Sequence, residues 1–443
     1  MHPNQSINTT HRTMSVLVRK LSPCVVRPSE PASMSGSTTI ELSSFDKGLE
    51  KIQATALLMF EHPIHEVANT IKGALSRALV HYYPIAGRIV AGDDDGNGVH
   101  IQCNGEGVAF VSASADCALK EAMFLDRSHG ARMLLDDLAI FCPAAGKGLG
   151  PADPLLMMQV TEFSCGGFVL GVTWNHAIAD GAGMAQFLQA VGELANGLPS
   201  PSIVPVRWDD SLPRPPASPK MNLKPLDDLR WLEFTIPSRS INQIKAEFKE
   251  RFPDSQPCTK FEAASGVLWQ CRTRAMVCSP ETPAFFMFLA NVRNHVLGAK
   301  KGYYGNCTKA ELIMATSGAV ADGDIVDLVK MIKDSKEKIG EQFRKKEISN
   351  DPQQEVGDQM QQLAQLQYNM LIVTSWGNLA FDEIDFGSGR PARVTTLGED
   401  KPSFPVCAVC LPWKAKHDGV NVLSAIVKEE HVDGFLGELA RFT

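Results

Sequence analysis

The stretch NHAIADGAGM, residues 175–184, places a histidine and an aspartate four positions apart, between two runs of different periodicity. The run before it, FVLGVTW (168–174), is typical of a buried strand, and the run after it, GMAQFLQAVGELA (183–195), has helical periodicity. The stretch is therefore expected to be the loop of a strand–loop–helix unit, which favours an α/β fold.

His176 and Asp180 leave three roles open. Aspartate is a favoured N-cap, so Asp180 can simply cap the helix. His176 lies where a loop can hold its imidazole at a cleft, ready to accept a proton near neutral pH as a general base, although a lone histidine is also often structural. A shared metal is the least favoured role, because Gly181 and Gly183 disfavour a continuous helix and no third His or Cys follows at the short spacing of zinc sites.

Length and composition set the class of protein. At 443 residues the chain exceeds what one hydrophobic core usually serves, so we expect two domains. The net charge of -7 gives no basic footprint, and no apolar run is long enough to cross a bilayer, so neither nucleic acid nor membrane is expected as a partner. The eleven cysteines are odd in number and scattered along the chain, which favours reduced thiols in a cytoplasmic protein.

A proline-rich segment divides the chain near its middle. Residues 199–225 hold eight of the 27 prolines, which excludes a helix or a central strand there and predicts an extended crossover on the surface. The expected organisation is a disordered leader at 1–13, an N-terminal domain at 14–198, the crossover at 199–228 and a C-terminal domain at 229–443.

Both halves mix helices and strands. A helix is predicted over 66–82, ended by the proline and glycine of YPIAGRI (83–89). A second helix is predicted over 258–276, with Thr259 and Glu262 at the spacing of a capping box.

Three further segments belong to the second half. Strands are predicted over 285–292 and 407–413. The last segment, 420–442, repeats the strand-then-helix order of 168–195, which fits two domains of related topology.

The tract TSWGNLAFDEIDFGSGRP (374–391) contains an aspartate, Asp385, beside two glycines. This composition predicts a tight turn held by Asp385. The letters DFG also occur in the magnesium loop of protein kinases, but the chain has no HRD-type catalytic loop and no glycine-rich phosphate loop, so that reading fails.

Together, HAIADG (176–181) and DFGSGRP (385–391) resemble the two signatures of the plant BAHD acyltransferases, HxxxD and DFGWG, in the same order and at about the same separation. The resemblance runs from about Val16 to the C-terminus. Four other stretches agree with it: YYPIAGRI (82–89), TKFEAASGVLW (259–269), NVRN (291–294) and GYYGNC (302–307).

The resemblance implies an α/β fold of two chloramphenicol-acetyltransferase-like domains with mixed sheets, joined by a long crossover. An active-site channel lies at the domain interface, with coenzyme A entering from one face and the acceptor from the other. His176 becomes the general base for attack of the acceptor on the thioester of an acyl-CoA. Acyl-CoA is then a co-substrate, no cofactor or metal is bound, and we expect a monomer.

The other site residues follow from the same resemblance. Asp180 pairs with Arg293 of NVRN and supports the loop that aims His176. The hydroxyl of Thr374 is the candidate donor to the oxyanion, and Trp376 lines the channel beside it.

Asp385 is grouped with His176 as an essential residue of the family, although its motif lies away from the reacting atoms and holds domain geometry. Ser388 stands where the family has tryptophan, which puts local rigidity in doubt more than chemistry. Losing a buried indole removes packing worth on the order of a few kcal/mol.

The substrates are the least determined part. GYYGN is similar to the branch with benzoyl- and alcohol acyltransferases, and YYGNC is similar to the YFGNC of the anthocyanin malonyltransferases, so neither stretch fixes the donor. Benzoyl or hydroxycinnamoyl donors are favoured, then acetyl, then malonyl. The acceptor is a small alcohol or amine of plant specialised metabolism. Two other functions stay open: a non-catalytic binding or scaffold protein, which Ser388 favours, and an acyl-CoA hydrolase that uses His176 to activate water.

Overall fold

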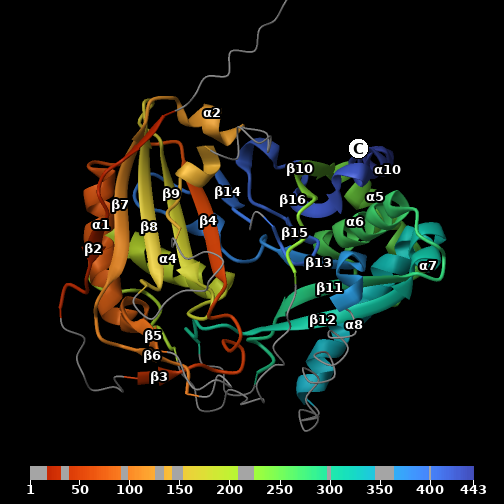
Figure 1. Ribbon diagram of the computed structural model, residues 1–443, viewed down its shortest axis with the longest axis horizontal. Coiled ribbons are helices and arrows are strands. Elements are labelled where there is room, and N and C mark those ends of the chain that lie inside the picture. The colour runs from red at the N-terminus through yellow and green to blue at the C-terminus, as the bar shows by residue number, and fades with distance from the viewer. Residues whose placement is uncertain are drawn as a thin grey trace, which may run out of the picture.

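A computed structural model of the chain describes residues 17–30, 39–90, 98–124, 134–141, 153–207, 224–296, 301–344, 364–398 and 401–443. The expected leader (1–13) and residues 208–223 of the crossover lie outside the described residues. Two large sheets lie side by side, one built mainly from each half of the chain (Figure 1).

The first sheet is mixed and seven-stranded, in the order β1-β7-β8-β9-β4-β14, with β2 also on β7. Only β7 and β8 run parallel within it, and every other pair is antiparallel. Its strands are β1 (Val18–Lys20), β2 (Cys24–Val26), β4 (Gln53–Phe60), β7 (Val108–Ala115), β8 (Leu156–Phe163), β9 (Phe168–Asn175) and β14 (Arg393–Thr396).

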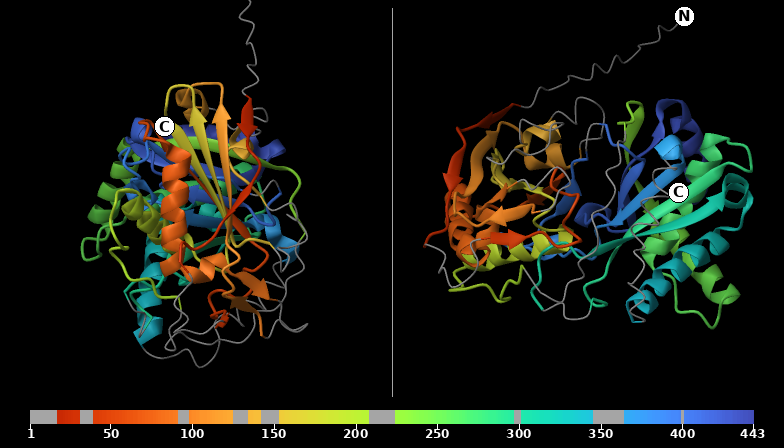
Figure 2. Two further views of the ribbon diagram at one scale, coloured as in Figure 1. Left: turned by 90° about the vertical axis from the view of Figure 1, so that its left-hand side faces the viewer. Right: turned by 60° about the horizontal axis from the view of Figure 1, so that its bottom comes forward.

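Two helices share the core of this sheet, α1 (Val67–His81) and α4 (Gly181–Ala195). Both place their apolar side chains in one buried cluster with β4, β8 and β9, in which Phe60 and Phe168 stack with ring centroids 4.7 Å apart. Burial of this kind stabilises a sheet by about 25 cal/mol per Å² of apolar surface. The left view in Figure 2 shows α1, in orange, lying beside the strands.

The second sheet is six-stranded, in the order β10-β16-β15-β13-β11-β12. The pairs β11–β13 and β13–β15 are parallel and the rest are antiparallel. Its strands are β10 (Leu229–Pro237), β11 (Pro283–Asn291), β12 (Thr308–Thr316), β13 (Met370–Ser375), β15 (Val406–Val409) and β16 (Gly419–Lys428).

The helices of the second half lie on the side of this sheet that faces away from the first sheet (Figure 1). They are α5 (Ser238–Arg251), α6 (Lys260–Met276), α7 (Ser317–Asp322), α8 (Ile325–Arg344) and α10 (Val432–Leu439). The opposite face of the sheet is therefore left to meet the first half of the chain. None of the described helices is long and apolar enough to cross a bilayer.

Smaller elements complete the described chain. A three-stranded sheet joins β3 (Thr39–Glu41), β6 (His100–Gln102) and β5 (Arg88–Val90). The short helices are α2 (Leu119–Met123), η1 (Tyr83–Ala86), η2 (Ala364–Asn369), η3 (Phe381–Glu383), η4 (Lys414–Lys416), η5 (Glu429–His431) and η6 (Ala440–Phe442).

Both helices predicted from spacing are present. The segment 66–82 forms α1, which ends at His81 before the 3-10 turn that contains Pro84. The segment 258–276 contains α6, and its capping box forms as expected. The backbone N–H of Thr259 donates to the Glu262 carboxylate at 2.7 Å, and the N–H of Glu262 donates to the Thr259 hydroxyl at 3.3 Å.

The strand predicted over 407–413 is too long. In the structure β15 ends at Val409, because Cys410 takes a left-handed backbone conformation with φ 58° that a strand cannot continue through. The strand at 285–292 is confirmed as β11. The repeated order is also present, since β16 is followed by α10 as β9 is followed by α4.

One strand of the second half joins the first sheet. Strand β14 pairs antiparallel with β4, from Arg393 opposite Met59 to Thr396 opposite Ala56. The guanidinium of Arg393 then bonds back to Glu233 on β10 of the second sheet. The division into domains at 199–228 stays a prediction, but a cut there does not separate the two sheets cleanly.

Candidate active site

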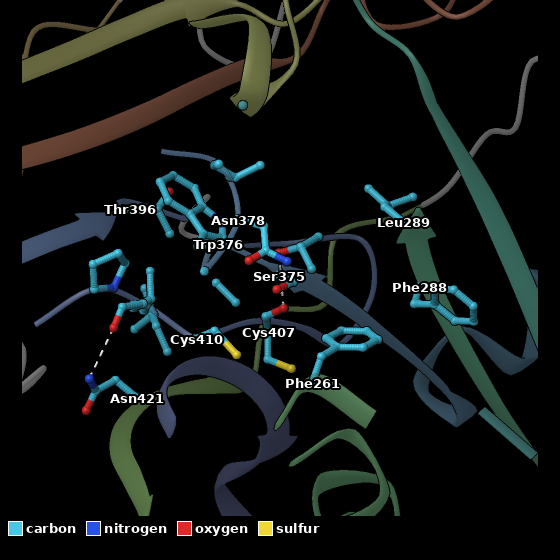
Figure 3. Close-up of a pocket in the computed structure, with 18 of the residues that line it drawn as sticks. Phe261, Phe288, Leu289, Ser375, Trp376, Asn378, Thr396, Cys407, Cys410 and Asn421 are labelled. Atoms are coloured by element: carbon cyan, nitrogen blue, oxygen red, sulfur yellow. Dashed lines mark hydrogen bonds between the residues drawn. The ribbon is translucent and has the colours of Figure 1, made fainter. Parts of the chain in front are cut away.

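A cavity of about 1510 Å³ lies between the two halves, bounded by residues of both sheets. The first half contributes His176 and Asp180, and the second half contributes Thr374 and Trp376. The cavity therefore brings together four of the six residues that the sequence nominated. Figure 3 shows part of its lining, with Trp376 and Asn378 from the loop after β13 across from Phe261 at the start of α6.

The loop that carries His176 is fixed by backbone bonds. The N–H of His176 donates to the carbonyl of Ile52 at 2.8 Å, and the Asn306 side-chain amide donates to the carbonyl of His176, also at 2.8 Å. The ring is only partly buried, and its Nδ1 has no hydrogen-bond partner among the described residues. The imidazole thus lies at the cavity, with its Nδ1 buried and without a partner among the described residues.

Asp180 does two things at once. One carboxylate oxygen caps α4 by accepting the N–H of Gly183 at 2.9 Å, and the other accepts the N–H of Cys307 at 3.0 Å. Arg293 donates to both oxygens, at 2.8 and 2.7 Å. Burial disfavours the charged guanidinium, but the carboxylate of Asp180 outweighs this and raises the pKa of Arg293. The expected pair of Asp180 and Arg293 is present, and Asp180 also caps α4.

Glycine is required where this loop meets the residues before Cys307. A Cβ on Gly183 would lie 1.8 Å from the carbonyl oxygen of Tyr304, and a Cβ on Gly305 would lie 2.4 Å from the hydroxyl of Tyr303. No ordinary side chain fits at either position. The stretches DGAG and YYGN therefore belong to one packed unit, which sequence spacing alone does not reveal.

Thr374 and Trp376 face the cavity from β13 and the residue after it. The Thr374 hydroxyl donates to the carbonyl of Cys407 at 3.3 Å, which is long for a bond from a hydroxyl. The indole of Trp376 stacks on Phe381, with ring centroids 5.3 Å apart and planes inclined by 20°. Trp376 also packs against the cores of both halves, so its position is well fixed.

The structure does not bring Asp385 to His176. Among the described residues that line the cavity, Asp385 is missing. Its carboxylate instead accepts the N–H groups of Gly387 and Gly389, at 2.7 and 2.9 Å, and closes the predicted tight turn. The turn uses one of the two carboxylate oxygens, Oδ1, and the grouping of Asp385 with His176 as an essential residue stays a prediction.

The turn docks on the end of α4. The Asn196 side-chain amide donates to the carbonyl of Asp385 at 2.9 Å, and a Cβ on Gly192 would lie 2.5 Å from that same oxygen. Phe386 packs edge-on against Phe60 in the first core. Ser388 is buried, and its hydroxyl has no partner among the described residues.

Basic side chains line the cavity in two groups, and could hold an anionic co-substrate. Lys260, Lys333 and Lys336 come from α6 and α8, and Arg390 and Lys414 come from the region around η4. The first group is balanced in part by neighbours, since Lys336 pairs with Glu262 at 2.9 Å and Lys333 with Glu337 at 2.8 Å. Among the described residues, no three His, Cys, Asp or Glu side chains gather as metal ligands would.

Comparison with known proteins decides the family. A family model described as the Transferase family matches residues 17–438. The chain belongs to this family, the BAHD acyltransferases. Acyl transferase 15 of Oryza sativa subsp. japonica is 44% identical, covering 97% of this chain and 99% of its own. A myricetin 3-O-glucosyl 1,2-rhamnoside 6'-O-caffeoyltransferase of Crocosmia x crocosmiiflora is 32% identical, covering 97% of this chain and 100% of its own. This BAHD protein is therefore an acyltransferase, as its motifs predict.

Solved structures confirm the fold expected for a BAHD acyltransferase. Vinorine synthase matches with a TM-score of 0.76 at 21% identity, covering 96% of this chain and 98% of its own. The F. sporotrichioides TRI101 complex with coenzyme A and T-2 matches with a TM-score of 0.70 at 18% identity, covering 92% and 99%. The two-domain, mixed α/β, chloramphenicol-acetyltransferase-like fold is thereby confirmed.

Sequence reasoning missed three residues around the HxxxD loop of this acyltransferase: Asp46, Arg207 and Asn306. Asn306 lies in GYYGNC, which was used only as a family signature. Two glycines, Gly302 and Gly305, precede Asn306 within four residues and are the local signal of a turn there. Asp46 and Arg207 carry no local pattern, because their partners are distant in sequence.

Proposed function

We propose that this acyltransferase moves an acyl group from coenzyme A to the hydroxyl or amine of a small acceptor, with His176 as general base. The observation that carries the proposal is the partly exposed imidazole on a backbone fixed at both its N–H and its carbonyl, within a cavity that residues of both halves line. A general base must lie within reach of the proton that it accepts, and the fixed backbone of this loop supports that role for His176.

The reaction balances without a covalent enzyme intermediate. The imidazole accepts the proton of the acceptor as its oxygen or nitrogen attacks the thioester carbonyl. The tetrahedral oxyanion then collapses, the carbon–sulfur bond breaks, and the imidazolium returns the proton to the departing thiolate. Holding donor and acceptor in one cavity supplies much of the rate, since it removes the entropy cost of a bimolecular encounter.

Thr374 is the proposed donor to the oxyanion. Its hydroxyl lies at the cavity and donates one 3.3 Å hydrogen bond, to the carbonyl of Cys407. During the reaction the hydroxyl can donate to the oxyanion instead. A bond that strengthens in the transition state lowers the barrier, whereas one equally strong in the ground state does not. Asp180 and Arg293 support this chemistry by fixing the far end of the His176 loop.

An aromatic donor, benzoyl- or hydroxycinnamoyl-CoA, is favoured over acetyl-CoA. The cavity is lined in part by Phe261, Phe288 and Trp376, which offer flat apolar surface to an aryl group. The relatives support either choice, because they include the caffeoyltransferase and a taxadien-5-alpha-ol O-acetyltransferase of Taxus chinensis at 28% identity. The basic side chains suit the phosphates of coenzyme A.

The test is a panel of benzoyl-, p-coumaroyl-, caffeoyl-, acetyl- and malonyl-CoA against small alcohols and amines, read by mass spectrometry. We expect an acylated product with strict dependence on one class of acceptor. Release of free acid at the same rate without acceptor would assign a hydrolase. Tight acyl-CoA binding with no turnover across the panel, beside an active relative as control, would assign a binding protein.

A further inference from the structure

A second buried ion pair, Asp46–Arg207, lies behind the loop of His176. The Arg207 guanidinium contacts the Asp46 carboxylate at 3.1 Å, and the two side chains are 3% and 0% exposed. Burial disfavours the charged guanidinium, yet the carboxylate of Asp46 outweighs this and holds the pKa of Arg207 above its ordinary value. The guanidinium of Arg207 therefore stays charged, and both side chains are buried.

Asp46 satisfies its buried carboxylate with donors from three separate segments. It accepts the N–H and hydroxyl of Ser43, at 2.9 and 2.6 Å, and the guanidinium of Arg207. It also accepts the backbone N–H and side-chain amide of Asn306, at 3.2 and 2.9 Å. A buried carboxylate with this many donors is a rigid anchor, since moving any one of them leaves charge unpaired.

The same network bonds two successive carbonyls of the HxxxD loop. The Asn306 amide that contacts Asp46 also donates to the carbonyl of His176 at 2.8 Å. Arg207 donates to the next carbonyl, that of Ala177, at 2.9 Å. Asp180 and Arg293 fix the end of this loop, whereas the Asp46 network fixes its beginning.

Arg207 reaches this point from the crossover between the two halves. The N–H of Val206 donates to Gly302 at 2.9 Å, and the N–H of Tyr304 donates to Val206 at 3.0 Å, so 205–207 runs beside 302–304. The crossover is thereby tied to the segment that supplies Asn306. The crossover therefore also contributes a side chain, Arg207, that bonds the HxxxD loop.

We propose that Asp46, acting through Arg207 and Asn306, is a positioning residue that sets the aim of the His176 imidazole. This inference rests on the proposed function of His176 as general base. It assigns a catalytic consequence to three residues outside the two family signatures, none of which is required to touch a substrate. Misplacement of a reacting group by about 1 Å costs up to roughly 100-fold in rate.

The test is Asp46→Asn in the wild-type and His176→Ala backgrounds, assayed with the best donor and acceptor of the panel. We expect kcat to fall about 10- to 100-fold, with the KM for acyl-CoA within about twofold. If Asp46 acts through the imidazole, the same change has no further effect on the residual rate of His176→Ala. A purely structural role lowers the rate in both backgrounds and overturns the inference.

The two proposals fail in different ways. A His176→Ala variant as active as the wild type overturns the general base. A His176→Ala variant that is nearly inactive, together with full additivity of Asp46→Asn, overturns only the positioning role. Glu438→Gln is the matched control, because it removes a carboxylate paired with Arg274 at 3.4 Å, far along the chain from the loop, and is expected to leave kcat unchanged.

Amide hydrogen exchange of the full chain measures the order of the His176 loop without any substrate. We expect faster exchange in the peptide spanning His176 and Ala177 for Asp46→Asn, and unchanged exchange there for Glu438→Gln. If Asp46→Asn does not fold, Asn306→Ala carries the test, since it removes the bond to His176 and keeps the Asp46–Arg207 pair. Normal exchange and normal kcat in Asn306→Ala would overturn the inference.

Discussion

Arg293 holds both carboxylate oxygens of Asp180, at 2.8 and 2.7 Å, while Asp180 caps the helix that follows the HxxxD loop. Asp180 belongs to the first half of the chain and Arg293 to the second. One carboxylate therefore serves a local purpose, the start of α4, and a long-range one, the contact between halves.

Removing either partner of this pair is expected to damage folding as well as activity. Asp180→Ala leaves a partly buried guanidinium unpaired, at a cost of about 3–5 kcal/mol. Asp180→Ala with Arg293→Ala should be less than additive in denaturant unfolding, because the second change removes the charge that the first stranded. Full additivity would show that the two side chains do not depend on each other.

Replacing His176 with Ala is expected to lower turnover by roughly two to four orders of magnitude, the range of general-base catalysis. Binding of coenzyme A, measured by calorimetry, should change little, because the backbone bonds of the loop do not involve the ring. Near-normal turnover with the preferred acceptor would contradict the assignment.

The strands, helices and family signatures could be predicted because each depends on residues close in sequence. Spacing predicted α1 and α6, and a capping box predicted the start of α6. The end of β15 could not be predicted, since Cys410 takes a left-handed backbone conformation that its residue type does not indicate. The Asp46–Arg207 pair could not be predicted either, because the two residues are distant in the chain and lie in no motif.

Thr374→Val removes the proposed oxyanion donor while keeping the shape of the side chain. We expect kcat to fall about 100- to 1000-fold with little change in KM, because the hydroxyl acts on charge that develops in the transition state. Thr374→Ser keeps the hydroxyl and is the matched control. Equal rates for the Ser and Val variants would rule out this role.

Ser388→Trp restores the family tryptophan in the turn after Asp385. Ser388 is 8% exposed, so we expect the indole to overpack its surroundings and lower the free energy of unfolding by roughly 1–3 kcal/mol. Ser388→Ala should be close to neutral, since the hydroxyl has no partner among the described residues. Unchanged melting with a switched donor preference would instead place this turn at the substrates.

Alkylation of cysteines distinguishes a direct transfer from an acyl-enzyme. Burial raises the pKa of the Cys410 thiol, which lines the cavity, so its thiolate fraction at neutral pH is below that of an ordinary thiol and grows as pH rises. Among the described thiols we expect iodoacetamide to modify the exposed Cys24 and Cys165 first, without loss of turnover. Peptide mass spectrometry follows the order, and loss of activity with those first adducts would contradict direct transfer.

Strand β14 gives the order in which this chain can assemble. Its residues 393–396 pair with β4, so the first sheet lacks that strand until almost the whole chain has left the ribosome. Until then the β4 edge stands unpaired, and an open edge strand is a template for association with other chains. The contact spans more than three hundred residues and closes late, which makes slow folding intrinsic to the topology. A fragment ending at residue 198 is therefore expected to aggregate when expressed alone, and adding the second half as a separate chain should rescue it only if residues 393–396 are included.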